Sequence, residues 1–424
     1  MHRYFFILGR YPSVSLAELK VVIKTISQAH VFEHISSEAV ICRTEKLLPI
    51  PTLIERLGGI VKAGEIYDEV HLDARNSGFE SIFSYENITA KYLPNIPKKT
   101  HLGISLYDVC GNYQLLKKLQ NNLQAINFMV KDNLKKKGIR VGFLRVKERY
   151  LTSVSVVKNG LLRQGVEIAL FLAKDSLLAG KTYTVQDFEK YSQRDIGRPY
   201  LDKKSGILPT KLARMLVNLA DMGSEEILLD PFCGSGTILQ EALLLGHTNI
   251  LGSDKSQKAI EDTKRNISWL QERYPQLLKK EIRLEIFLTD VVRLSARLSH
   301  QTVDAIVTEP YLGPPMVGKP DTSMIQKIQH EISLLYTSAF VEFSKIVKKN
   351  GKVIIIFPAF FLEGKRHFLP ILSEIRRCGF VVDSLLEDSE LRLVGGEQTG
   401  RNSLLYGSKG QFVFREIVRF IKTV

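Results

Sequence analysis

The sequence predicts a doubly wound α/β domain in the C-terminal part of the chain, preceded by smaller α+β domains. From Leu208 onward, long helical patterns alternate with apolar strands, which is the order of a mostly parallel sheet. Within this part a buried strand runs into a glycine-rich turn at residues 230–237. Before Lys98, by contrast, short strands and helices alternate. The length of 424 residues is enough for two to four domains.

Composition indicates a folded, basic protein. The 59 Lys and Arg residues exceed the 45 Asp and Glu residues and give a net charge of +14, while 44% of residues are hydrophobic. Such an excess favours an anionic partner, nucleic acid before a membrane surface, although a merely solubilising surface stays open. The length excludes a single small binding module.

Cysteine usage and the N-terminal residues lead us to expect a cytoplasmic protein. The four cysteines lie far apart without a C-x-x-C pair, so we expect neither a disulfide framework nor a cysteine zinc site. The apolar run in residues 4–8 is too short for a signal peptide, and no stretch approaches the roughly 18 apolar residues of a membrane span. We therefore expect no membrane and no metal as partners, and a monomer is favoured over an oligomer.

The N-terminal elements predict a small α+β unit. Residues 4–8 are an apolar strand, and Ser15 and Glu18 stand at the spacing of a capping box that would open the next helix. A short strand at 39–42 and a segment at 53–57 leading into a glycine pair follow. Prolines and lysines interrupt the pattern around residue 97, where we place the first boundary.

The next segment contains a strand at 102–106 and a long helix. Apolar residues recur at helical spacing between 115 and 137, namely Leu116, Leu119, Leu123, Ile126, Val130 and Leu134. The helix is expected to end at Gly138, directly after three lysines. Residues 174–204 are polar and charged, and we interpret them as an interdomain linker.

Basic residues follow the long helix. Arg140, Arg145, Lys147 and Arg149 punctuate apolar strand residues, which alone favours a solvated sheet face. The preceding run of Lys135, Lys136 and Lys137 moves the interpretation toward phosphate binding. Both interpretations stay open at this point.

The glycine-rich turn has the features of a nucleotide-type site. Gly234 and Gly236 allow the backbone to bend sharply after Asp230, and the amides at the following helix start are free to face a ligand. Asp254 ends the next strand, 24 residues later, at the spacing of an acid that binds ribose hydroxyls. An NAD site is disfavoured because Leu239 occupies the third small position, and no P-loop lysine follows. A tight turn without ligand is the weaker alternative.

The D-P-F-C-G-S-G-T string at 230–237 resembles the first motif of class I S-adenosylmethionine-dependent methyltransferases, especially those that modify exocyclic amines. The resemblance implies that the turn contacts the methionine and ribose parts of the cofactor, that Asp254 binds the ribose hydroxyls and that Asp290 binds the adenine amine. A plain loop or cap aspartate remains an alternative for Asp290. The implied cofactor-binding residues are Asp230, Pro231, Phe232, Gly234, Ser235, Gly236, Thr237, Asp254, Asp290 and Thr308.

A second motif follows the strand at 304–307. Relatives usually carry D-P-P-Y or N-P-P-Y here, in which the polar side chain and a proline carbonyl hold the amine while the aromatic ring stacks on the base. This chain has Glu309, Pro310 and Tyr311 instead, with a longer acid and the tyrosine one position early. We expect these three residues to be catalytic in a working variant of the motif. A silent site is the alternative, because near-attack geometry tolerates little error.

Nearly the whole chain is similar to THUMP-containing tRNA guanine-N2 methyltransferases. Residues 4–19 and 57–66 resemble their N-terminal ferredoxin-like domain. Residues 194–199 and 206–214 resemble their linker and first catalytic helix, and residues 401–406 and 411–416 resemble their closing strands. The resemblance implies a ferredoxin-like domain at 1–96, a THUMP domain at 97–173, a linker at 174–204 and a Rossmann-like class I methyltransferase domain at 205–424.

The function implied by this resemblance is S-adenosylmethionine-dependent methylation of guanine N2 in tRNA, near the acceptor stem or the tRNA core. The THUMP region would bind the tRNA. Methylation of another exocyclic amine, such as adenine N6 in RNA or DNA, is one rival, and an RNA-binding module without activity is another. The hypothetical RNA contacts are Lys135, Lys136, Lys137, Arg140, Arg145, Lys147 and Arg149.

Overall fold

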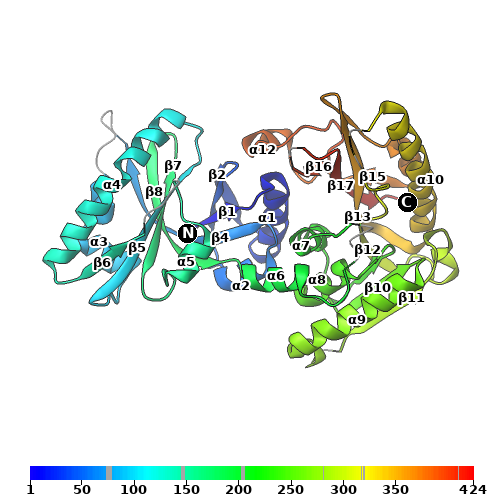
Figure 1. Ribbon diagram of the computed structural model, residues 1–424, viewed down its shortest axis with the longest axis horizontal. Coiled ribbons are helices and arrows are strands. Elements are labelled where there is room, and N and C mark those ends of the chain that lie inside the picture. Colours follow the sequence, from blue (N-terminus) through cyan, green and yellow to red (C-terminus); the bar gives the residue numbers. More distant parts are fainter. Residues whose placement is uncertain are drawn as a thin grey trace. The chain divides into compact units, whose positions relative to one another are not determined.

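The structure is a computed structural model that describes residues 1–72, 79–144, 149–201, 206–279, 281–316, 318, 320–408 and 410–424. It divides into two compact units (Figure 1), Met1–Phe188 with Leu393–Gly395 and Glu189–Arg392 with Gly396–Val424. In the described part of the chain, no helix has the length and apolarity needed to cross a membrane. The two expected RNA contacts Arg145 and Lys147 lie outside the described residues.

The first unit begins with a βαββαβ arrangement. Its elements are β1 (His2–Leu8), α1 (Pro12–Ile26), β2 (His30–Ile35), β3 (Ala39–Thr44), α2 (Ile50–Arg56) and β4 (Ile60–His71). The strands lie in the order β2-β3-β1-β4, with β1 antiparallel to both neighbours. This is the ferredoxin-like topology, and the expected α+β class is therefore confirmed.

Helix α1 does not start where the capping-box spacing predicts. It begins at Pro12, whose fixed φ suits the first helical turn, and Ser15 lies buried inside the helix. The Ser15 hydroxyl donates a hydrogen bond to the Tyr11 carbonyl at 3.0 Å. Glu18 accepts hydrogen bonds from the N–H groups of Gly58 and Gly59 at 2.8 and 2.7 Å. The prediction of the helix start was wrong because Glu18 holds the turn before β4 instead of capping its own helix.

The rest of the first unit is also α+β. Its main elements are β5 (Lys99–Asp108), α4 (Tyr113–Lys136), β6 (Arg140–Phe143), α5 (Ser153–Lys158), β7 (Val166–Leu172) and β8 (Ser176–Val185). The buried residues of α4 are the six apolar residues that the sequence placed at helical spacing. The prediction of this helix and of its core-facing stripe is confirmed.

One continuous sheet crosses the first unit, in the order β2-β3-β1-β4-β8-β7-β5-β6. Strand β8 pairs with β4 along the register Lys62↔Val185 to His71↔Ser176 and with β7 on its other side. The interpretation of 174–204 as a linker is therefore corrected for β8, whose first five residues are buried. The polar residues further along this stretch, where α6 (Phe188–Ile196) follows, hid the strand signal.

The second unit is built around a mostly parallel sheet. Its strand order is β11-β10-β9-β12-β13-β17-β15, in which β9 to β13 run parallel and β17 runs antiparallel to β13 and β15. The prediction of a doubly wound α/β domain is confirmed. The strands are β9 (Ile227–Asp230), β10 (Asn249–Asp254), β11 (Arg283–Leu288), β12 (Val303–Thr308), β13 (Val347–Leu362), β14 (Lys365–His367), β15 (Phe380–Val382), β16 (Leu404–Tyr406) and β17 (Val413–Lys422).

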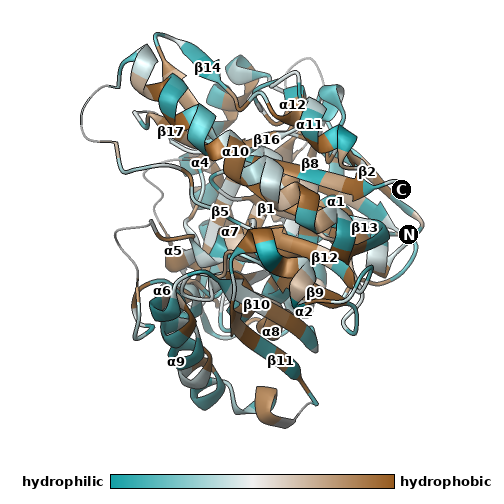
Figure 2. Cartoon of the chain, turned by 90° about the vertical axis from the view of Figure 1, so that its right-hand side faces the viewer, coloured by the Kyte–Doolittle hydropathy of each residue, from teal (hydrophilic) through white to brown (hydrophobic). Residues whose placement is uncertain are grey.

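Helices cover this sheet. They are α7 (Thr210–Leu219), α8 (Thr237–Leu245), α9 (Gln257–Arg273), α10 (Thr322–Ile346), α11 (Leu372–Arg377) and α12 (Asp388–Leu393). Figure 2 shows β9, β12 and β13 largely in brown, as expected for strands buried on both faces, whereas α9 is largely teal. The aromatic rings of Phe340, Phe357 and Phe420 pack in the core between α10 and the sheet.

A buried ion triad fixes α6 to α7 and α8 inside the second unit. Arg194 of α6 and Arg214 of α7 each place Nε 2.6 Å from a different carboxylate oxygen of Glu241 in α8. The Glu241 side chain is 0% exposed. Because an unpaired charge is unfavourable in such a place, the three helices are held in one mutual arrangement. Arg194 belongs to the segment 194–199, whose resemblance to a family linker was noted in the sequence analysis.

Candidate active site

A cavity of about 1050 Å³ opens at the carboxyl ends of β9, β10 and β12. These ends meet at one edge because the strands are parallel and adjacent, with Gly252 in register with Asp230 and Leu229 with Ile306. Most of the residues predicted for cofactor binding and catalysis line this cavity: Asp230, Pro231, Phe232, Gly234, Ser235, Thr237, Asp254, Asp290, Glu309, Pro310 and Tyr311.

Asp230 is a buried carboxylate at the end of β9. Its Oδ1 accepts hydrogen bonds from the Thr308 hydroxyl at 2.7 Å and from the Phe232 N–H at 3.2 Å. Burial nevertheless raises its pKa to about 7, assisted by the negative charges of Asp254 and Glu309. Thr308 is itself fully buried, so it orients Asp230 from behind and does not line the cavity.

The glycine turn has the backbone that the sequence predicts. Gly234 and Gly236 have φ of +51° and +81°, in the left-handed region that favours glycine. Gly236 caps the start of α8, so that the first amides of this helix follow the turn directly. A Cβ at Gly236 would lie 2.8 Å from Cγ2 of Thr263. Gly236 therefore shapes the turn without lining the cavity.

Gly236→Ala is expected to lower the free energy of unfolding of the second unit by about 2–3 kcal/mol, since it adds a close contact to an unfavourable φ. The fluorescence of Trp269, the single tryptophan of the chain, reports this unit during urea unfolding. Gly364→Ala is the matched control because its φ is +78° and an added Cβ would meet nothing within 4 Å. Equal losses in both variants would mean that the Thr263 contact is harmless.

Two further carboxylates are held toward the cavity by backbone donors. Asp254 accepts the Gly234 N–H at 3.1 Å through Oδ2 and the Ser256 N–H at 2.9 Å through Oδ1. Asp290 caps the short helix Val291–Ala296 through a 3.2 Å hydrogen bond from the Val292 N–H. Asp290 thus caps a helix, as the alternative of a plain cap aspartate predicts, and it lines the cavity as well.

Glu309 is paired with an arginine that the sequence did not single out. Arg415 of β17 places Nε 2.5 Å from Oε1 of Glu309, with Nη2 3.4 Å from Oε2. Both side chains line the cavity. Tyr311 is 51% exposed at the mouth of the cavity, and its carbonyl accepts a 3.0 Å hydrogen bond from the buried Tyr336 hydroxyl. The closing-strand segment 411–416 was noticed in the sequence, but nothing in it indicated that Arg415 reaches Glu309.

The described basic residues of the first unit fall into two groups. Lys135, Lys136, Lys137 and Arg140 are exposed; Lys136 pairs with Asp132 at 2.8 Å, and Lys137 lies 5.1 Å from the ring centre of Tyr85. Arg149 instead forms a two-point ion pair with Glu38 at 2.5 and 3.2 Å. The guanidinium of Arg149 is therefore committed to a partly buried ion pair, whereas the ion pairs of Lys136 with Asp132 and of Lys137 with Glu86 are exposed.

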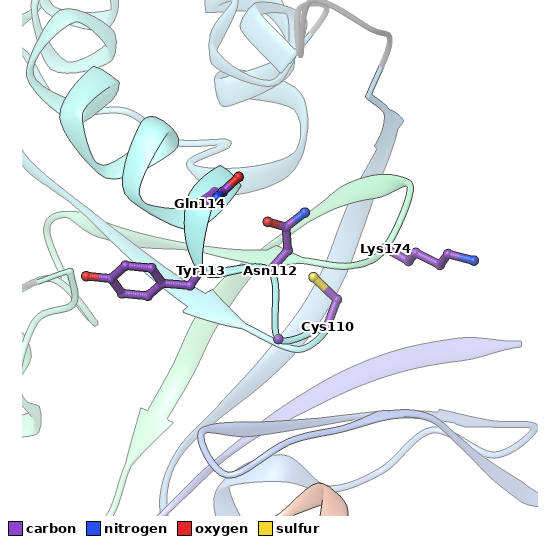
Figure 3. A pocket seen from close by; sticks show the side chains of 6 residues that line it. Cys110, Asn112, Tyr113, Gln114 and Lys174 are labelled. Carbon is purple, nitrogen blue, oxygen red and sulfur yellow. The ribbon is translucent and has the colours of Figure 1, made fainter.

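A smaller cavity of about 440 Å³ lies in the first unit at the start of α4. In Figure 3 the side chains of Tyr113 and Lys174 point in opposite directions, and no group of side chains converges. Burial raises the pKa of the Cys110 thiol, which makes it a poorer nucleophile. We assign this cavity no role.

Two family models match parts of this chain. Residues 198–360 match the family model described as the RMKL-like methyltransferase domain. These residues form a methyltransferase domain. A model described as DNA methylase matches residues 97–265.

Two curated relatives are named tRNA (guanine(10)-N2)-dimethyltransferase. The protein of Methanocaldococcus jannaschii is 29% identical over 204 residues, which is 47% of this chain and 52% of the relative. The protein of Methanothermobacter thermautotrophicus is 33% identical over 147 residues, or 34% and 38% of the two chains. The matched part thus spans about half of the first relative and less of the second.

Two solved structures share the fold over nearly the whole chain. TrmN from Thermus thermophilus has a TM-score of 0.56 at 14% identity, covering 99% of this chain and 100% of its own. A possible methylase from Clostridium difficile 630 has a TM-score of 0.50 at 14% identity, covering 100% and 98%. The doubly wound α/β fold is therefore shared with both structures, together with the α+β region that precedes it.

Proposed function

We propose that this protein transfers a methyl group from S-adenosylmethionine to the exocyclic N2 amine of a guanine in tRNA, near the acceptor stem or the tRNA core. The proposal rests mainly on the observation that the Glu309-Pro310-Tyr311 segment and the glycine turn line one cavity. The methyltransferase-domain match supports the reaction, and the names of the two curated relatives support the guanine substrate.

The cavity fits the proposed cofactor by its chemistry. Asp254 and Asp290 offer carboxylate acceptors for hydroxyl and amine donors, and the left-handed glycines let the backbone approach a ligand closely. The negative charges of ionised Asp230 and Asp254 suit a positively charged sulfonium, whereas the charge of Glu309 is balanced by Arg415. When bound, the cofactor supplies an electrophilic methyl group with a good leaving group. The proposed binding residues are those predicted from the sequence. Thr308 and Gly236 do not line the cavity; Thr308 orients Asp230, and Gly236 shapes the glycine turn.

The catalytic residues would act mainly by positioning. The Glu309 carboxylate and the Pro310 carbonyl accept hydrogen bonds from the amine, and the exposed ring of Tyr311 is available to stack on a base that has left its helix. As the N–C bond forms, the amine nitrogen becomes positively charged. Its proton then passes to Glu309 or to water.

In this proposal the first unit binds the tRNA. Its ferredoxin-like topology supports a division into a ferredoxin-like part at 1–96 and a THUMP domain at 97–173, with β8 completing their common sheet. Lys135, Lys136, Lys137 and Arg140 are the proposed phosphate contacts, because they are exposed and clustered at the end of α4 and the start of β6. A tRNA substrate supports a cytoplasmic location, and we propose that the protein is a monomer.

Replacing Lys135, Lys136 and Lys137 together by Ala is expected to weaken tRNA binding about tenfold or more at low salt and to reduce the slope of log K against log salt by about two. Filter binding over a salt series measures both quantities. Lys117→Ala with Lys118→Ala is the matched control, because these exposed lysines lie at the opposite end of the same helix. An unchanged slope in the triple variant would assign the lysines to a solvated face.

The test of the activity is labelled-methyl transfer from S-adenosylmethionine into unmodified tRNA with nucleoside analysis. The native protein is expected to produce N2-methylguanosine, whereas Asp230→Ala and Glu309→Ala lose the product. Glu272→Ala, on the exposed side of α9, serves as the control. Binding of tRNA without any product would favour an inactive RNA-binding module.

The second candidate is methylation of adenine N6 in RNA or DNA. The match of residues 97–265, which include the glycine turn at 230–237, to a model described as DNA methylase favours it. Methyladenosine in the product, or transfer to DNA in place of tRNA, would support this candidate against guanine N2.

A further inference from the structure

The ion pair between Glu309 and Arg415 joins the Glu309-Pro310-Tyr311 motif to a residue outside that motif. Glu309 follows β12 and Arg415 lies in β17, the strands on either side of β13. Thr308 is in register with Ile355 and Arg415 with Pro358 of β13, so the pair spans this strand. The side chains of Glu309 and Arg415 are 13% and 23% exposed, and both line the cavity.

Arg415 also connects Glu309 to the backbone segment before α7. Its Nη2 lies 3.4 Å from the Ile207 carbonyl, in the segment between Gly206 and Leu208 that lines the cavity before α7. The Tyr336 hydroxyl holds the backbone two residues after Glu309. The carboxylate thus has a fixed direction, in spite of the additional methylene that distinguishes Glu from the Asp or Asn of the usual motif.

An ionised carboxylate held in this way only accepts hydrogen bonds. Guanine presents adjacent donors on its Watson–Crick edge, the N1–H and the N2 amine, whereas adenine presents an acceptor at N1 beside its N6 amine. The two carboxylate oxygens can accept both donors of guanine. Against adenine, one of the oxygens would face the N1 acceptor, which is unfavourable. Arg415 occupies Oε1 closely, at 2.5 Å, while Oε2 is the less tightly bound oxygen at 3.4 Å.

We propose that Arg415 is a positioning residue that sets the Glu309 carboxylate against the N1–H and N2 amine of the target base, and that this pair selects guanine. The proposal rests on the proposed methyl transfer to tRNA and identifies which groups of the site choose the base. It also gives the altered motif a physical reason, because the reach of Glu309 is set by its partner on β17.

The deciding experiment first identifies the guanosine that receives the methyl group. It then uses a tRNA in which only this guanosine is replaced by 2,6-diaminopurine riboside. This base keeps the N2 amine but has an acceptor at N1. We expect the native protein to show a kcat/KM about 10- to 100-fold lower on this tRNA, since an acceptor would face an acceptor. In Glu309→Gln, kcat/KM on the two tRNAs should differ by no more than about threefold. The Gln amide can donate a hydrogen bond to the N1 acceptor of 2,6-diaminopurine, which a carboxylate cannot do.

The role of Arg415 is tested with Arg415→Met and Arg415→Lys in the same assay. Arg415→Met is expected to lower kcat on the guanosine tRNA at least tenfold and to narrow the ratio between the two tRNAs, with S-adenosylhomocysteine binding unchanged within twofold. Arg415→Lys should recover part of both effects. Arg419→Met is the control, because Arg419 lies on the same strand and pairs with Asp383, away from the residues that line the cavity.

The outcomes separate the two proposals. Native protein that methylates both tRNAs equally well would overturn the selection by Glu309 while leaving the guanine-N2 activity intact. Normal selectivity in Arg415→Met would show that Arg415 does not position the acid. No methyl transfer to either tRNA would refute both the proposed function and the inference built on it.

Discussion

Asp230→Asn is expected to abolish methyl transfer and at the same time to raise the free energy of unfolding of the ligand-free protein at pH 8. The variant keeps an oxygen that can accept the Thr308 hydroxyl and the Phe232 N–H, so the local hydrogen bonds survive. It removes the charge that we propose to match the cationic cofactor. Loss of activity and gain of stability therefore have the same cause.

The direction of the stability change follows from the pKa of Asp230. Burial raises this pKa from 3.8 to about 7, so the folded protein binds the proton more tightly than the unfolded chain. The free energy of unfolding contributed by Asp230 therefore falls as the pH rises from about 4 to about 7. An uncharged Asn escapes this loss, which we expect to be worth about 2–4 kcal/mol at pH 8 and progressively less toward pH 5.

Urea unfolding followed by Trp269 fluorescence at pH 5 and pH 8 measures the effect, and calorimetric titration with S-adenosylmethionine measures cofactor binding. In the native protein the cofactor should bind about tenfold more tightly at pH 8 than at pH 6, because the ionised fraction of Asp230 rises by about that factor. The variant should lack this dependence. Native binding that is independent of pH would contradict an Asp230 that titrates in this range.

Glu241→Ala is expected to destabilise the second unit by about 3–5 kcal/mol. It leaves two buried guanidinium groups, Arg194 and Arg214, without the carboxylate they share, and removing one member of a buried pair is far more unfavourable than removing the whole pair. The same Trp269 measurement applies. Because α8 begins at the glycine turn, cofactor binding should weaken as well.

Exposed Glu272 provides the control for this variant, and Glu272→Ala should change stability by less than about 0.5 kcal/mol. A triple variant with Met at 194, 214 and 241 should recover much of the loss, since apolar groups of similar size need no partner. Recovery would attribute the effect of Glu241→Ala to unpaired charge; failure to recover would attribute it to packing.

Features carried by local patterns could be predicted from the sequence. The stripe of α4 was complete because its six apolar residues follow the helical period without interruption. The glycine turn and the acid after the next strand could be placed at one edge because parallel strands share the direction of their carboxyl ends. Most predicted site residues line the cavity for this reason.

Features that depend on distant partners could not be predicted. Ser15 and Glu18 have capping-box spacing, but Glu18 binds amides 40 residues away, which no local pattern reveals. The strand β8 was missed because its short apolar start runs into polar residues, and only its pairing with β4, far earlier in the chain, places it inside the sheet. The contact from Arg415 to Glu309 joins residues 106 positions apart across an intervening strand. In each case tertiary packing decided the role of a residue whose type alone was ambiguous.

The position of β8 in the sheet also constrains how the protein is made. Strand β4 ends at His71, but its outer neighbour β8 extends to Val185, so the edge of β4 has no partner until more than a hundred further residues have been synthesised. At typical translation rates of about 5–20 residues per second, this edge waits for several seconds outside the ribosome. Exposed strand edges are prone to pair with other chains. The nascent protein is therefore most vulnerable to aggregation during this interval, and slowing translation after residue 71 should lower its soluble yield.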